Sequence, residues 1–182
     1  MNPVLIVVIA AVVILAGYFI SISNRLNRAK VKIDEAGSDI DVSLTKRYDV
    51  LTKMVDVVKS YAKYEKETIF QTVQLRRNMS MQEKSEANRI MGENFERIHA
   101  LAENYPDLKA SANYNTLQKA IADVEEHLQA SRRLYNANVS RYNQMLVAFP
   151  TSLIAGMKGM TKEEFFTAEE SKRQDVKMDL DF

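Results

Sequence analysis

Residues 4–22 read VLIVVIAAVVILAGYFISI, and this stretch decides the class of the protein. None of these side chains is charged. An α-helix of this length, rising about 1.5 Å per residue, spans about 28 Å, close to the thickness of a bilayer core. The stretch is too long for the apolar region of a signal peptide, and no basic leader or small-residue cleavage site flanks it. We therefore predict an uncleaved transmembrane anchor over residues 1–24.

Basic residues follow the anchor on one side only. Four of them lie directly after it: Arg25, Arg28, Lys30 and Lys32. On the other side the α-amino group is the single positive charge. The positive-inside rule then predicts a single-pass protein with its N-terminus outside and its body in the cytoplasm. The same cations would favour anionic lipid, but topology alone accounts for them, so the sequence predicts no specific lipid recognition.

The composition favours long helices. The chain of 182 residues has only 5 Gly and 3 Pro, and neither type occurs between Gly37 and Gly92 or between Pro106 and Pro150. We predict an all-α fold, in which the N-terminal transmembrane helix precedes an antiparallel bundle of three to four long helices with coiled-coil-like packing. The bundle is expected over residues 25–168 and a polar C-terminal tail over 169–182.

Charge and cysteine content exclude several classes of function. The formal net charge is +1, which does not suggest a nucleic-acid binder. The absence of Cys excludes disulfides, thiolate metal sites and a cysteine nucleophile.

The segment Asp49–Tyr64 has an unusually wide apolar face. On a helical wheel this face covers roughly 200°, about twice what a helix needs to pack on one core. One edge, which we assign to the core of the bundle, contains Leu51, Val55 and Val58. The other edge, a possible self-association face, contains Val50, Val57 and Tyr61. Two neighbouring helices of the same bundle would explain the wide face equally well.

The middle of the chain predicts a break and a second helix. Residues 76–88 are polar without an apolar period, so we expect a loop there and a helix from about Glu86 to Asn104. Asn104–Asp107 is a turn signal. Ser111 or Asn113 can then cap a third helix.

The third helix carries two rows with a seven-residue period. The rows are Ile121, Leu128, Tyr135, Tyr142 and Phe149, and Leu117, Val124, Ser131, Asn138 and Met145. Such a repeat predicts left-handed, coiled-coil-like packing. Its second half would place a polar layer in the core, formed by Ser131, Tyr135, Asn138 and Tyr142. We expect these side chains to hydrogen-bond to the other helices and to fix their register rather than to line a ligand cavity.

Pro150 should end the third helix, with a short helical turn after it. The apolar residues beyond this point are Met157, Met160, Phe165 and Phe166. We expect them to cover the end of the bundle, although contact with the membrane surface or with a neighbouring subunit remains open.

The sequence contains no recognisable catalytic or ligand-binding motif. His99 and His127 lie on different predicted helices and have no metal-binding spacing. Phosphate-binding glycine loops and nucleophile elbows are absent as well. We therefore predict no enzymatic activity, no cofactor, no metal site and no small-molecule substrate.

Four blocks of the sequence resemble the LemA family of bacterial membrane-anchored helical proteins. They are DEAGSDIDVSLTKRYD (34–49), VKSYAKYEKET (58–68), LAENYPDLKA (101–110) and RRLYNANVSRYNQMLVAFPTSLIAG (132–156). The blocks are long and ordered along the chain. One departure is Gly37, where a large aromatic residue often stands in the family.

The resemblance implies a bacterial inner-membrane protein with one N-terminal transmembrane helix and a helical bundle, without an assigned activity, substrate or cofactor. Relatives in magnetosome membrane biogenesis, and others near membrane proteases or signalling systems, suggest a role at the membrane. Our first hypothesis is a non-enzymatic scaffold that contacts the lipid bilayer and self-associates as a homo-oligomer. The alternative is a membrane-tethered adaptor or signalling module that binds another protein, such as a protease or a sensor kinase.

Overall fold

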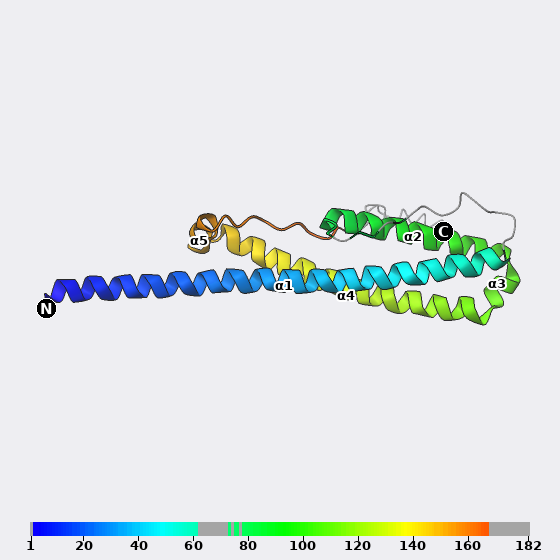
Figure 1. The fold of residues 1–182 in the computed structure, drawn as a ribbon, viewed down its shortest axis with the longest axis horizontal. Helices are drawn as coiled ribbons and strands as arrows, with labels where there is room; N and C mark the ends of the chain where they lie inside the picture. The colour runs from blue at the N-terminus through cyan, green and yellow to red at the C-terminus, as the bar shows by residue number, and fades with distance from the viewer. Residues whose placement is uncertain (1, 62–72, 74, 77, 168–182) are drawn as a thin grey trace, which may run out of the picture. The chain divides into compact units, whose positions relative to one another are not determined.

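The computed structural model describes residues 2–61, 73, 75–76 and 78–167. All regular secondary structure among the described residues is helical, and none of these residues lies in a strand. The helices are α1 (Pro3–Tyr61), α2 (Met81–Asn104), α3 (Pro106–Ala110), α4 (Ala112–Val147) and α5 (Thr151–Met157) (Figure 1). The predicted all-α fold class is therefore confirmed. Residues 62–64 of the wide apolar segment and the predicted tail, residues 169–182, lie outside the described residues.

Helix α1 runs for 59 residues without interruption, so the predicted anchor and the first helix of the body are one element. Among the described residues, α1 is the helix that is long and apolar enough to cross a membrane. Its most apolar 18-residue window has a mean hydropathy of 2.9 and is only 6% buried. Low burial at such hydropathy is typical of a helix whose surroundings are lipid rather than protein.

Helix α2 begins earlier than the sequence pattern predicted. The expected loop over residues 76–88 is wrong in its second half, because α2 starts at Met81. Ser80 and Glu83 form a capping box: the Ser80 hydroxyl accepts from the Glu83 N–H at 3.1 Å, and the Glu83 carboxylate accepts from the Ser80 N–H at 2.7 Å. Two otherwise unsatisfied donors are thereby paired, which allows a polar segment to start a helix.

The remaining helix ends follow the sequence signals. Helix α2 ends at Asn104, and Pro106 occupies the first turn of the short α3. The Ser111 hydroxyl accepts a hydrogen bond from the Tyr114 N–H at 3.2 Å, so the predicted cap of the third helix is confirmed. Helix α4 ends at Val147, shortly before Pro150, and α5 follows as the predicted helical turn.

In the second half of α4, the buried positions differ from the predicted heptad rows. Val124, Leu128, Tyr135 and Tyr142 are buried on these rows, but Val139, which lies on neither row, is fully buried. Asn138 is only half-buried, and Phe149 is 81% exposed. An α-helix drifts by about 20° per heptad against a strict seven-residue repeat, so the buried position moves from residue 138 to residue 139.

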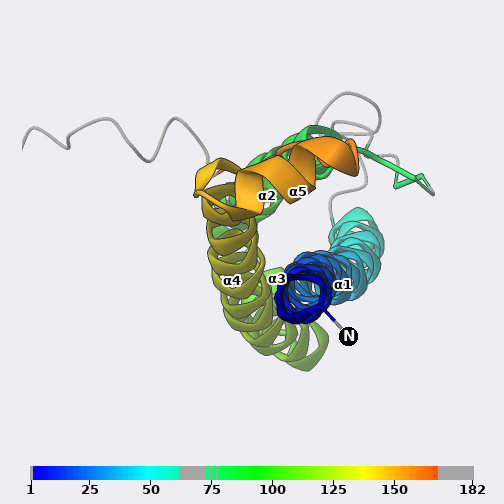
Figure 2. The same ribbon diagram turned by 90° about the vertical axis from the view of Figure 1, so that its left-hand side faces the viewer.

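The chain forms two compact units. The first consists of residues 1–38 and 133–164, and the second of residues 39–132 and 165–182. In the first unit Ile22, Leu26, Ile33 and Ala36 of α1 are buried, as are Val139 of α4 and Ile154 and Ala155 of α5. Figure 2 shows α5 turning from the end of α4 toward the side of α1.

The second unit has its own helical core. Its largest fully buried side chains are Ile40, Leu44, Met54 and Val58 of α1, Met91 and Ile98 of α2, Leu108 of α3 and Leu128 of α4. Phe166, which follows the helices in the chain, is also buried in this unit. Helix packing on helix is the architecture that the long apolar periods predicted.

Candidate functional site

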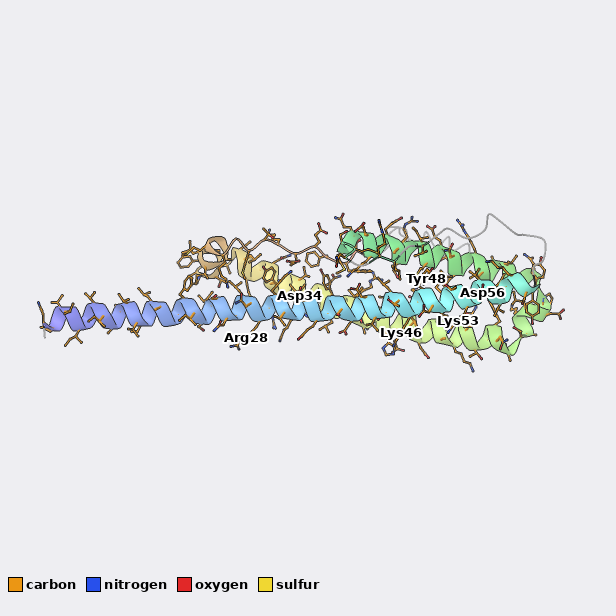
Figure 3. The ribbon with its side chains drawn as sticks, in the orientation of Figure 1. Arg28, Asp34, Lys46, Tyr48, Lys53 and Asp56 are labelled. Carbon is orange, nitrogen blue, oxygen red and sulfur yellow. The ribbon has the colours of Figure 1, made fainter. Side chains whose placement is uncertain are left out.

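The basic residues after the anchor divide into two groups. Arg25, Arg28 and Lys32 are exposed. Lys30 is half-buried and pairs with the carboxylates of Glu163 at 2.5 Å and Asp34 at 3.6 Å. Figure 3 labels Arg28 and Asp34 on this part of α1. The four residues were predicted as one topological group, but only Lys30 belongs to an ion-pair network of the first unit.

A groove of about 760 Å³ opens beside the exposed basic group, and both of its walls belong to the first unit. We call it the juxtamembrane groove. Its α1 wall consists of Gly17, Ile20, Ser21, Asn24, Arg25, Arg28, Ala29 and Lys32. Its α4 wall consists of Asn138, Arg141 and Met145. The groove therefore extends from the last turns of the predicted anchor into the first turns of the body.

The juxtamembrane groove is strongly positive. Arg25, Arg28, Lys32 and Arg141 bring four cations to its walls, and no carboxylate is among the residues that line it. Within the described part of the chain, none of these four side chains forms an ion pair. Such a concentration of one charge raises the local concentration of anions.

The two walls are held together by a hydrogen bond. The Asn138 side-chain amide donates to the backbone carbonyl of Lys32 at 3.1 Å. Asn138 was predicted as part of a polar core layer, and the structure places it at the edge of the groove, half-buried. In the first unit α4 runs in the direction opposite to α1 (Figure 1).

Helix α5 is attached to α1 at the end of the predicted anchor. The Lys158 ammonium group donates to the Ser23 hydroxyl and to the Asn27 side-chain oxygen, at 2.8 Å each. Three apolar side chains at intervals of four residues remain exposed around α5: Phe149, Leu153 (61%) and Met157 (76%). Leu153 and Met157, four residues apart in α5, lie on one face of this helix.

The segment after α5 lies across α4 as a strap, which we define as residues 158–164. Asn143 and Glu163 exchange two hydrogen bonds of 2.9 Å, one from the Asn143 amide to the Glu163 carbonyl and one from the Glu163 N–H to the Asn143 side-chain oxygen. The Tyr135 hydroxyl donates to the Glu164 carbonyl at 3.0 Å. The hydroxyl of Tyr135 was expected to bond to another helix, and it bonds to the strap instead.

The other members of the predicted polar layer lie in different surroundings. Tyr142 is buried in the first unit, whereas Ser131 is half-buried in the second. Burial raises the pKa of Tyr135 to about 12, with a further contribution from the nearby carboxylates of Glu163, Glu164 and Asp34. Burial and the charge of Glu163 also raise the pKa of Tyr142. Both phenols are therefore neutral at physiological pH.

Arg47 organises the second unit and was missed by the sequence analysis. This buried guanidinium pairs with Glu125 of α4, donates to the backbone carbonyl of Asn88 in α2 at 2.8 Å, and hydrogen-bonds to the Asn88 side chain. It also lies over the ring of Phe95, 5.4 Å from its centroid. The available signal was an Arg between Leu44 and Leu51 on the apolar face of α1.

The predicted self-association face is partly accessible in the second unit. Val50 and Val57 are half-buried, and Tyr61 is 41% exposed. On the core edge, Leu51 and Val58 are buried as expected, but Val55 is half-buried and Met54 is the buried residue between them. Leu51, Met54 and Val58 follow the three- and four-residue steps that keep side chains on one helix face.

The two histidines do not form a common site. His99 of α2 lies near α4, with Nδ1 3.5 Å from the Tyr114 hydroxyl and 3.4 Å from the Gln118 amide, while His127 is exposed. No cluster of three or more metal-ligating side chains occurs among the residues that the structure describes.

Comparison with known proteins relates the chain to a family. The model of the LemA family matches residues 36–180. Protein LemA of Metamycoplasma hominis is 30% identical over 170 residues, which cover 87% of this chain and 76% of that protein.

A shorter similarity extends to magnetosome proteins. Magnetosome protein MamQ of Magnetospirillum gryphiswaldense is 26% identical over 70 residues, or 38% of this chain and 26% of that protein. Magnetosome protein MamQ 2 of Paramagnetospirillum magneticum is 27% identical over a match of the same length. Together with the apolar start of α1, these similarities point to a membrane-associated helical protein.

Proposed function

Because this chain belongs to the LemA family, we propose that it is a non-enzymatic scaffold, anchored in the membrane by one helix and self-associating in the membrane plane. The observation that supports the proposal best is the continuity of α1 from Pro3 to Tyr61. One helix supplies both the candidate membrane span and core residues of both units, such as Leu26 and Leu44. A bundle built onto its own anchor is suited to organising a membrane surface.

Self-association in this proposal uses the face formed by Val50, Val57 and Tyr61. These side chains lie on α1 at the edge of the second unit's core and retain exposed apolar surface. Anchoring confines the copies to two dimensions and raises their effective concentration, so a weak lateral contact is sufficient for assembly. The proposed orientation is the one that the positive-inside rule predicts, with the body in the cytoplasm of a bacterial cell.

A second candidate function is an adaptor that binds another membrane protein. It is favoured by the exposed apolar side chains of Leu153, Met157 and Phe165 in and after α5. Exposed apolar surface of this kind is typical of protein or membrane contacts.

The mass of the detergent-solubilised full-length protein distinguishes the two candidates. Light scattering coupled to size-exclusion chromatography, corrected for detergent, should give a defined oligomer for a scaffold. A monomer over the whole accessible concentration range would contradict the scaffold and favour the adaptor. Cross-linking in intact membranes should give the same answer, which guards against dissociation by detergent.

A further inference from the structure

The scaffold proposal leaves the cations of the juxtamembrane groove without a role. Topology requires positive charge near the anchor, but it does not require Arg141 of α4 to face Arg25, Arg28 and Lys32 of α1 across a groove. We infer that this groove binds an anionic phospholipid from the leaflet on the body side of the anchor. The inference rests on membrane anchoring and is independent of the proposed self-association.

The three cations of α1 lie on one face of the helix. At 100° per residue, Arg25, Arg28 and Lys32 fall within an arc of about 60°. Lys30 falls about half a turn away, where it pairs with Glu163. The helix therefore places Lys30 in an ion pair within the first unit and places the other three cations in the groove with Arg141.

Polarity changes along the groove in the way that a phospholipid requires. Gly17 and Ile20 lie within the predicted membrane span and line one end, where an acyl chain would lie. Arg25, Arg28 and Lys32 follow on the body side, at the depth of the head groups. Guanidinium groups suit a phosphate because they can donate two parallel hydrogen bonds to its oxygens.

The apolar end of the groove has free space. A Cβ atom built on Gly17 would meet no atom within 4 Å, so there is open space beside this position of α1. A larger side chain at position 17 would fill this space without disturbing the helix. Gly17→Leu is therefore a variant that occupies the groove and leaves all four cations in place.

The occupant is assigned by charge and position. Four cations and no carboxylate line the groove. It should therefore prefer a lipid with a net negative charge over a cationic or a zwitterionic lipid. Its apolar end lies within the predicted span, where the surrounding solvent is lipid. A soluble anion would satisfy the cations but not the apolar end, whereas an anionic phospholipid satisfies both.

The test uses the full-length protein in vesicles with a fluorophore beside the groove. The chain has no Cys, so Ala148→Cys gives a single labelling position that is exposed, near Met145 and outside the groove walls. Quenching is measured with phosphatidylglycerol brominated on its acyl chains and with equally brominated phosphatidylcholine, in vesicles of matched composition. We expect a preference for phosphatidylglycerol of at least about tenfold, since each of the cations near the surface contributes severalfold.

Two variants and a matched control separate specific binding from general surface charge. Arg28→Gln/Arg141→Gln should remove most of the preference, and Gly17→Leu should lower it with no change in charge. Lys46→Gln/Lys53→Gln removes the same charge from exposed positions further along α1 (Figure 3) and should leave the preference unchanged. Circular dichroism should give equal helicity for all of these proteins.

The proposal is overturned by any of three results. The first is a wild-type protein that does not prefer phosphatidylglycerol over phosphatidylcholine. The second is an equal loss of preference in the Lys46/Lys53 control. The third is competition by inorganic phosphate in the aqueous phase that abolishes the preference at constant ionic strength, which would identify a soluble anion as the occupant. The oligomeric state of the same samples reports separately on the scaffold proposal.

Discussion

The Tyr135 hydroxyl of α4 donates a 3.0 Å hydrogen bond to the backbone carbonyl of Glu164, at the end of the strap. The adjacent Glu163 receives the Lys30 ammonium group of α1 at 2.5 Å, so the strap is joined to both long helices of the first unit. A segment without regular secondary structure is thereby fixed by side chains of α1 and α4. Its position depends on the protonation of the groups that hold it.

Alkaline pH should loosen the strap through Tyr135. Its pKa is raised to about 12 by burial and neighbouring carboxylates, above the value of about 10 for an unfolded chain. The neutral phenol is thus favoured by folding, so its contribution to stability is complete below about pH 10 and is lost between about pH 10 and pH 12. Denaturant unfolding of wild type and Tyr135→Phe across this range measures the effect.

Tyr135→Phe should be less stable by about 1 kcal/mol at neutral pH, because the Glu164 carbonyl loses its donor. The stability difference between the two proteins should shrink as the pH rises, since the variant has no phenol to ionise at this position. If this stability difference stays constant from neutral pH to about pH 12, ionisation of the Tyr135 phenol does not affect the stability of the fold, and the prediction is wrong.

Arg47 should be a main determinant of the second unit's stability. Arg47→Ala leaves Glu125 and Asn88 without the guanidinium and creates a cavity beside Phe95, so we expect a loss of about 3–5 kcal/mol. Arg47→Met fills much of the same volume and should cost clearly less. Urea unfolding followed by circular dichroism gives both values, and equal losses would mean that packing volume does not matter at this position.

The long helices could be predicted from the sequence because they depend on local patterns. The uncharged run before Arg25 and the scarcity of Gly and Pro predicted an anchor and long helices after it, but not that the two would form one continuous α1. Ser111 marked the start of α4. The burial of Val139 could not be predicted, because the drift of a helix against a seven-residue repeat depends on how straight the helix is.

The candidate site was less predictable, because it depends on pairs of residues far apart in the sequence. Charge counting identified Arg25, Arg28 and Lys32 but could not show that Arg141 faces them, or that Lys30 meets Glu163. Arg47 was overlooked for the same reason, since its partners lie on α2 and α4. A charged residue on an apolar helix face indicates a buried partner without identifying it.

The capping box explains why α2 starts within a polar segment, and it can be tested directly. Ser80→Ala removes the acceptor for the Glu83 N–H and should cost about 1 kcal/mol. Ser80→Asp retains an acceptor and should stay near wild type. Hydrogen exchange should become faster only in the first turns of α2 in Ser80→Ala. Unchanged exchange there would contradict the assigned role of the box.

The orientation of the anchor can be measured with single cysteines. Asn2 lies before the predicted span and Ala110 lies in α3 of the body, and both are exposed. The positive-inside rule predicts that an impermeant thiol reagent labels Asn2→Cys in intact cells and labels Ala110→Cys only after lysis. Labelling of Ala110→Cys in intact cells would reverse the proposed topology, and Cys-free wild type provides the background.

Two substitutions on α1 separate assembly from folding. Met54 is 1% exposed in the core of the second unit, so Met54→Glu buries an unpaired charge and should unfold that unit. Val57 is half-buried on the proposed self-association face, where a glutamate can reach water in the monomer but not in an interface. Val57→Glu should therefore keep its helicity and lose assembly.

Both variants are studied by circular dichroism and by cross-linking in membranes. The two measurements decide whether one edge of the wide apolar face of α1 packs in the core and the other contacts a second subunit. Val57→Gln is the matched control, because it has a similar shape without the charge and should assemble better than Val57→Glu. If Val57→Glu loses as much helicity as Met54→Glu, both edges of α1 pack within one chain. If it remains folded and still forms cross-linked oligomers, copies meet through another surface. Loss of cross-linking at full helicity would place the contact between subunits on Val57, as the scaffold proposal requires.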